Sequence, residues 1–291
     1  MKLSTAIRRF DCQLRADGKS PHTRAVYLRD LRLLAKWRRR DVNISTITPA
    51  KLARFLTSRI FTHTASGKPK ATISINRSKS ALRSFFRFLT DAGHLNANPA
   101  RLIRSAPASQ RPPRVLTHKE ARALLATIKK HRTPIAKRDH LMFSLLLGTG
   151  IRLASLVNLN VGDVDLGSGT IRINGKGNVE RLVFLNRRLK QLLKGYLASH
   201  ADTSDPLFLS LRTRRIGARQ VELRLAYWLE QAGVTCRCSV HTLRHTFATR
   251  LYQKTGDLLL VKRALGHSRI TTTEIYTHPC DATLKQAFQK L

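Results

Sequence analysis

The sequence predicts a mainly helical protein with one small β-hairpin (an α+β class), built from two domains that a short linker joins. Apolar residues recur at helical spacing along most of the chain, whereas the alternation that is typical of a strand occurs only around residues 170–185. A stretch rich in proline, serine and alanine, residues 105–114, has the composition of an extended linker. The length of 291 residues is sufficient for two domains of ordinary size.

The first domain, residues 1–104, is expected to contain only helices. Two helix starts carry the same signal, a hydroxyl residue that can cap the helix followed by a proline in its first turn, at Ser20-Pro21 and at Thr48-Pro49. Asn98-Pro99 closes the domain. The sequence predicts helices over residues 3–16, 21–37 and 71–92, with one more that begins at Thr48.

The second domain, residues 115–291, is expected to combine helices with the hairpin. A capping box formed by Thr117 and Glu120 opens it. The hairpin is predicted from strands over residues 170–174 and 179–185, with a tight turn of glycines, lysine and asparagine between them. Helices are expected over residues 118–130, 134–148, 187–199, 217–232, 241–251, 257–265 and 282–290.

The charge of the chain favours a polyanionic partner. There are 54 Lys and Arg residues against 17 Asp and Glu residues, a formal net charge of +37, and the excess is spread along the whole chain. Nucleic acid is the favoured partner, because each phosphate contact made by Lys or Arg releases counterions. A ribosome-type RNA binder and a membrane-surface protein are the alternatives that composition leaves open.

The chain is not expected to span a membrane. The longest apolar stretch, Leu141 to Leu147, is far shorter than the ~20 residues that a span requires. The N-terminal residues MKLSTAIRRF carry charges where a signal peptide needs an apolar core, and four cysteines suggest no disulfide framework. These features together predict a cytoplasmic protein.

Basic residues along the predicted helix over residues 71–92 are candidates for contact with DNA phosphates. A solvated helix face is the alternative, and the overall charge of the chain favours the phosphate contacts. The candidates are Arg77, Lys79, Arg83 and Arg87.

The second domain also holds residues suited to cutting and rejoining a phosphodiester. That chemistry needs a nucleophile, cations in fixed positions that offset transition-state charge, and an acid that protonates the leaving oxygen. His241 and Arg244 share a helix face, because they are three residues apart. Each motif alone is a weak signal. In chain order the candidates are Arg152, Lys176, His241, Arg244, His267 and Tyr276.

These candidates resemble, in order and rough spacing, the active-site set of the tyrosine recombinases, the phage integrase family. The segments SVHTLRHTFAT and LGHSRITTTEIYTH are most similar to the Xer-like members, and the helical first domain resembles the family's core-binding domain. One residue departs from the pattern. Ser155 stands where the family usually has an acidic residue, three positions after Arg152, so the contacts around Arg152 are expected to differ.

The resemblance implies a site-specific DNA recombinase. Tyr276 would attack the phosphate and form a 3′-phosphotyrosyl bond, with His241 taking or sharing its proton. Lys176 would donate a proton to the leaving 5′ oxygen. Because the covalent bond preserves the energy of the broken ester, neither a metal nor ATP is implied.

The remaining candidates and the partners follow from the same resemblance. Arg152 and Arg244 would bind the non-bridging oxygens, and His267 would hydrogen-bond the scissile phosphate. The implied partner is double-stranded DNA, with a homotetramer on two recombination sites, and the free protein could be a monomer. The short apolar face of the helix over residues 282–290 is expected to dock on a neighbouring protomer. No arm-binding domain precedes the first domain, which favours an Xer-like task over integration of the lambda kind.

Several alternatives stand beside this interpretation. Tyr252 is the rival nucleophile by position. Cys236, Cys238, His241 and His245 offer ligands that zinc prefers, but Cys-x-Cys is tighter than the usual structural spacing, so no metal site is predicted. A type IB topoisomerase uses related tyrosine chemistry, and a non-catalytic DNA-binding relative would keep the fold alone.

Overall fold

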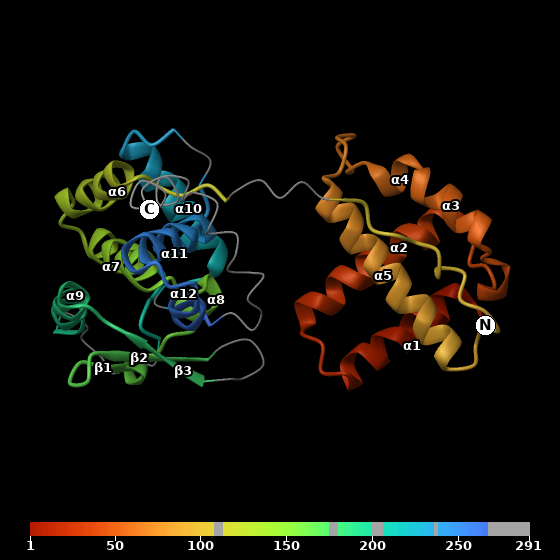
Figure 1. The fold of residues 1–291 in the computed structure, drawn as a ribbon, viewed down its shortest axis with the longest axis horizontal. Helices are drawn as coiled ribbons and strands as arrows, with labels where there is room; N and C mark the ends of the chain where they lie inside the picture. The colour runs from red at the N-terminus through yellow and green to blue at the C-terminus, as the bar shows by residue number, and fades with distance from the viewer. Residues whose placement is uncertain (108–112, 175–179, 199–205, 213, 236–237, 267–291) are drawn as a thin grey trace, which may run out of the picture. The chain divides into compact units, whose positions relative to one another are not determined.

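The computed structural model divides into two compact units, Met1–Gln110 and Arg111–Leu291, which are described separately (Figure 1). It describes the chain except for residues 108–112, 175–179, 199–205, 213, 236–237 and 267–291. The predicted architecture, mainly helical with one small sheet, is confirmed. None of the helices in the described ranges is both long and apolar enough to cross a membrane.

The first unit is a set of helices whose starts follow the predicted caps. Ser20 and Thr48 each accept a hydrogen bond from the backbone N–H three residues further on, and prolines occupy the first helical positions. Two single-turn elements were not predicted, because they are too short to show a period. The elements are α1 (Leu3–Ala16), α2 (Pro21–Arg38), the 3-10 turn η1 (Ile44–Thr46), α3 (Pro49–Thr57), α4 (Arg59–Thr62) and α5 (Thr72–Asp91).

Aromatic rings fill the core of the first unit. Phe10 of α1 packs on Phe85 of α5 with ring centroids 5.4 Å apart, and Phe55 packs on Phe61 at 5.0 Å. All four side chains are at most 2% exposed. The α5 helix therefore has one apolar face committed to the core, which leaves its basic residues on the other faces.

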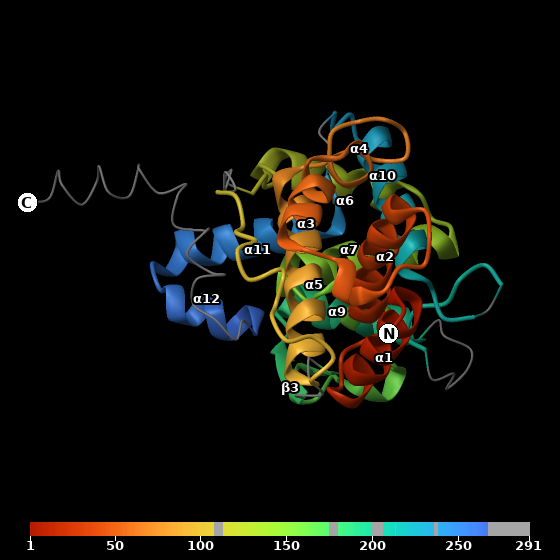
Figure 2. The ribbon, with the colours of Figure 1, turned by 90° about the vertical axis from the view of Figure 1, so that its right-hand side faces the viewer.

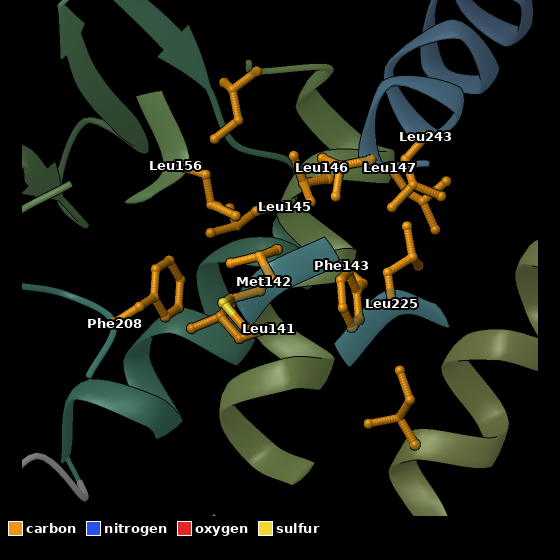
Figure 3. Close-up of a cluster of buried hydrophobic side chains, with 14 of the residues drawn as sticks. Leu141, Met142, Phe143, Leu145, Leu146, Leu147, Leu156, Phe208, Leu225 and Leu243 are labelled. Atoms are coloured by element: carbon orange, nitrogen blue, oxygen red, sulfur yellow. The ribbon is translucent and has the colours of Figure 1, made fainter. Parts of the chain in front are cut away.

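The second unit is built around α7 (Pro134–Thr149), in which every residue from Arg138 to Leu147 is buried. A helix that is apolar nearly all round belongs in a core. Leu141, Met142 and Leu145 meet side chains from several neighbouring elements (Figure 3). Around it lie α6 (His118–Lys130), α8 (Leu153–Val157), the 3-10 turn η2 (Val161–Asp163), α9 (Arg187–Ala198), α10 (Ala218–Gln231), α11 (Val240–Thr255) and α12 (Leu258–Leu265).

A buried ionic cluster fixes α7 to α10. Asp139 is 0% exposed and accepts hydrogen bonds from Arg138 Nη2 at 2.7 Å, Arg224 Nε at 2.6 Å and Trp228 Nε1 at 2.8 Å. Arg138 Nη1 also donates to the carbonyl oxygen of Leu209 at 2.7 Å. A buried carboxylate that is satisfied in this way holds its neighbours in one arrangement. The cluster therefore makes α7 a rigid base for the turn that follows it.

The three strands form an antiparallel sheet in the order β1-β2-β3: β1 (Val164–Asp165), β2 (Thr170–Asn174) and β3 (Glu180–Phe184). The two strands of the predicted hairpin are confirmed, whereas β1 was missed because two residues cannot show alternation. The register pairs Ile171 with Val183 and Ile173 with Arg181. Since residues directly opposite each other lie on the same face of the sheet, Arg181 shares the face of three buried apolar residues.

Candidate active site

Arg244 is the most buried of the predicted site residues that the structure describes, with 2% exposure. It lies in the second turn of α11, whose start is fixed by a capping box between Ser239 and Thr242. Its Nη1 donates to the carbonyl oxygen of Gly150, and its Nη2 donates to the carbonyl oxygen of Leu265 at 2.7 Å. These two bonds fix the guanidinium between the end of α7 and the end of α12.

Arg152 reaches the same place from a tight turn. Gly150 ends α7 in the left-handed conformation, at φ 62°, and an added Cβ would collide with the ring of Phe247. The turn buries Ile151 and places Arg152 at the N-cap of α8. Arg152 Nη2 donates to the carbonyl oxygen of Gly266 at 3.3 Å. The glycine-bounded turn that the sequence singled out therefore delivers an arginine to the carboxyl end of α12.

His241 lies one turn before His245 on α11, and their rings meet edge to face with centroids 4.8 Å apart. Although His241 is exposed on one side, partial burial lowers the pKa of its imidazole, and the charges of Arg244 and Arg152 lower it further, against Glu222, which raises it. Both arginines therefore lie within electrostatic range of His241. These effects favour the neutral form of the ring, which is the form that can accept a proton.

Arg181 of β3 reaches the same helix end, and the sequence analysis did not single it out. Its Nη1 donates to the carbonyl oxygen of Ala264 at 2.9 Å, one residue before the carbonyl that Arg244 holds. Burial lowers the pKa of the Arg181 guanidinium, and the charge of Arg152 lowers it further. Strand alternation puts this arginine on the same face as Val183, but the sequence does not show that this face is the buried one.

Three predicted catalytic residues, Lys176, His267 and Tyr276, lie outside the described residues, as does the predicted helix over residues 282–290. The rival nucleophile Tyr252 packs instead against the small apolar cluster of α11 and α12. Those two helices lie side by side in both views (Figure 1, Figure 2).

Of the four residues considered for zinc, the structure describes Cys238, His241 and His245. Cys236 is outside the described residues. In the part of the chain that the structure describes, no group of three or more His, Cys, Asp or Glu side chains is placed to hold a metal ion.

The basic residues of α5 largely serve contacts within the first unit. Arg77 Nε lies 3.4 Å from the buried carboxylate of Asp30. Lys79 Nζ donates to the carbonyl oxygen of Arg104 at 3.1 Å, and Arg83 Nη1 donates to that of Ile103 at 2.9 Å. Arg87 is exposed. Lys79 and Arg83, two of the four residues predicted to contact DNA, thus bind the segment at residues 103–104, where the chain leaves the first unit.

Models of two protein families match this chain. The phage integrase family matches residues 114–283, and the phage integrase N-terminal SAM-like domain matches residues 7–93. The tyrosine recombinase XerC of Thermodesulfovibrio yellowstonii is 34% identical over 270 residues, which are 90% of this chain and 87% of the relative. The tyrosine recombinase XerC of Vibrio parahaemolyticus is 40% identical over 216 residues, 72% of this chain and 69% of the relative.

Solved structures agree with these matches. The XerH site-specific recombinase bound to palindromic difH substrate superposes with a TM-score of 0.74 and 25% identity, over 90% of this chain and 78% of that one. A lambda integrase dimer bound to a COC′ core site shares the fold, with a TM-score of 0.73 and 21% identity over 94% of this chain and 97% of that one. The chain therefore belongs to the phage integrase family and is an Xer-like tyrosine recombinase, an enzyme of site-specific DNA recombination.

Proposed function

We propose that this recombinase cuts and rejoins DNA through Tyr276, with Arg152, His241 and Arg244 acting on the scissile phosphate. The observation that supports the proposal most strongly is that Arg152 and Arg244 both donate to carbonyl oxygens at the carboxyl end of α12, with His241 within electrostatic range of both arginines. The chain leaves α12 there and continues toward His267 and Tyr276. Arg152 contacts a residue 114 positions further along the chain and Arg244 contacts one 21 positions further, so residues far apart in the sequence are gathered where the predicted nucleophile segment begins.

The two arginines suit the role of phosphate ligands. A guanidinium stays charged at every accessible pH and donates from a planar fork that matches two phosphate oxygens. The bonds from Arg244 to two carbonyl oxygens fix its plane before DNA binds. Charge that develops in the transition state then meets donors that need no reorganisation.

His241 and Lys176 would move the protons. The neutral imidazole of His241 can take the proton of the Tyr276 phenol, whose usual pKa of ~10 leaves it protonated at neutral pH. Lys176 would protonate the leaving 5′ oxygen, and the 5′-hydroxyl of a second strand would then attack the phosphotyrosyl bond. No step requires a metal or ATP, because the ester energy is kept in the covalent bond.

The proposed partner is double-stranded DNA, contacted by both units, with the exposed Arg87 of α5 on a phosphate. Strand exchange between two sites further requires four protomers, so a homotetramer on two recombination sites is proposed, formed from free monomers.

The apolar residues among 282–291 would join neighbouring protomers. A deletion of residues 282–291 should leave half-site binding intact and abolish cooperative assembly on gels. The location proposed for this reaction is the cytoplasm.

A covalent trapping experiment tests the proposal. Genomic DNA fragments that the protein binds are first isolated, and a nick is introduced near the cut site so that the cleaved strand cannot be rejoined. The protein is incubated with these fragments, and protein-linked DNA is scored on a denaturing gel. Tyr276→Phe should bind DNA like the wild type and give no covalent product. Tyr252→Phe is the matched control and should react normally, because Tyr252 packs in the α11–α12 cluster.

Other results would replace the proposal with a named alternative. Covalent product from Tyr276→Phe that disappears in Tyr252→Phe would move the nucleophile to Tyr252. A wild-type protein that binds DNA and never becomes linked to it would be a non-catalytic relative. Relaxation of supercoils without strand exchange would indicate a topoisomerase.

A further inference from the structure

The carboxyl end of α12 is held by three arginines from three different elements. Arg181 of β3 donates to the carbonyl oxygen of Ala264 at 2.9 Å, Arg244 of α11 to that of Leu265 at 2.7 Å, and Arg152 at the start of α8 to that of Gly266 at 3.3 Å. The last carbonyls of a helix have no partner within the helix, and positive charge is favourable beside them. Three consecutive peptide groups are thus fixed from three directions.

Two of these arginines belong to the predicted active site, and the third does not. Arg181 lies on the inner face of the sheet, between Val183 on its own strand and Ile173 opposite. Its Nε and Nη2 are buried, and among the described residues neither has a hydrogen-bond partner and no carboxylate pairs with the guanidinium. Burying such donors is unfavourable, so a position that served packing alone would take an apolar side chain.

Gly266 shows how closely Arg181 approaches this end of the helix. Gly266 caps α12 with φ 62°, and an added Cβ would lie 2.5 Å from Nη1 of Arg181 and 3.0 Å from its Cζ. Both the left-handed backbone and the space therefore require glycine. The contact between β3 and the end of α12 is close, and it involves the last described residue before His267.

The place of Arg181 in the chain shows what this contact connects. Arg181 follows Lys176 by five residues, on the strand that returns from the hairpin tip. Its partner Ala264 precedes His267 by three residues. Since β3 is paired with β2 along its whole length, a contact that fixes Arg181 also fixes the position of both strands of the hairpin. A single hydrogen bond thus joins the hairpin that carries the predicted proton donor to the segment that carries the predicted nucleophile.

We propose that Arg181 is a positioning residue of the recombination reaction, which sets the hairpin bearing Lys176 in register with the carboxyl end of α12. This inference rests on the proposed function. The arginine acts through Lys176, and the unfavourable burial of its charge is kept because the contact places the proton donor. A displacement of a reacting group by ~1 Å can cost about a hundredfold in rate.

The test compares Arg181→Met with Arg181→Lys, and uses Arg172→Met as the matched control. Methionine keeps the unbranched shape and removes the charge and the donors. Arg172 lies on the neighbouring strand with its side chain exposed, so its replacement removes the same charge from the same sheet. Cleavage rates at saturating protein are measured on ordinary DNA and on DNA with a 5′-bridging sulfur, which leaves without a proton donor. DNA affinity and the melting temperature are measured in parallel.

We expect Arg181→Met to bind DNA as Arg172→Met does and to melt no lower than the wild type. Its cleavage of ordinary DNA should fall by about tenfold to a hundredfold, with a clearly smaller loss on the sulfur substrate. Arg181→Lys, which keeps the charge and one donor group but loses the planar fork, should give an intermediate rate. Arg172→Met should cleave both substrates normally.

Three results would overturn the inference. They are a normal rate for Arg181→Met on ordinary DNA, equal losses on the two substrates, and a lowered melting temperature that accounts for the lost activity. Failure of the proposed function is distinguishable from all three, because the wild-type protein itself would then form no covalent product with either substrate.

Discussion

At the scale of single residues, the surroundings of His245 link the folding of the second unit to pH. Burial lowers the pKa of His245 to about 4, and the charges of His241 and Arg244 act in the same direction. An unfolded histidine titrates near 6.5. The unfolded chain therefore takes up a proton first as the pH falls, and the folded state loses stability between about pH 6.5 and pH 4.

We predict that the free energy of unfolding falls over this pH window by about 3 kcal/mol at most through His245 alone. Urea unfolding at a series of pH values, followed by tryptophan fluorescence, measures the loss. His245→Asn should flatten the profile, whereas His118→Asn, at an exposed position of α6, should not. A profile of the same steepness in His245→Asn would show that other groups carry the dependence.

At the scale of elements, α5 has a second role beside its place in the core. Asn76 pairs with Ala106 in both directions, with Nδ2 donating to the Ala106 carbonyl oxygen at 2.8 Å and the Ala106 N–H donating to Oδ1 at 2.9 Å. Together with Lys79 and Arg83 it holds residues 103–106 along the helix. The chain therefore leaves the first unit at a defined place.

Asn76→Ala should release this attachment without unfolding the helix. Amide hydrogen exchange should become about twofold to tenfold faster at Ala106, since a typical hydrogen bond contributes about 0.5–1.5 kcal/mol. Protection within the buried face of α5 should stay as it is. Arg87→Ala is the control on the same helix, because Arg87 is exposed and makes none of these contacts. Unchanged exchange at Ala106 would mean that Asn76 does not secure the chain.

Some of the helices and strands could be predicted from the sequence, and some of their contacts could not. Caps at Ser20, Thr48 and Thr117 act on neighbouring residues, so the starts of α2, α3 and α6 were predictable from local chemistry. The meeting of Arg152 and Arg244 with the end of α12 joins residues far apart in the chain. The family resemblance implied only that both arginines act on one phosphate, not that they contact this helix end. Arg181 escaped because its role depends on which face of β3 is buried, which a five-residue strand does not reveal by itself.

At the scale of the whole molecule, the net charge of +37 makes DNA binding an ion-exchange process. With ~6–10 phosphate contacts, affinity should fall by about three to five decades between 50 and 200 mM salt. Anisotropy titrations of a labelled duplex at several salt concentrations measure the slope. If Arg87 contacts a phosphate, Arg87→Gln should reduce that slope by about one unit. A nearly flat dependence would contradict binding by both units.

The attachment of residues 103–106 to α5 also limits how independently the two units can search for DNA. From Ala106 to Arg114 the chain spans about eight residues, which reach at most ~29 Å whatever their conformation. If both units bind DNA, as proposed, binding of one unit confines the other near the same stretch of duplex at an effective concentration of the millimolar order. Because effective concentration falls as a tether lengthens beyond the span it must bridge, each residue held on the helix makes the capture of the second unit more probable.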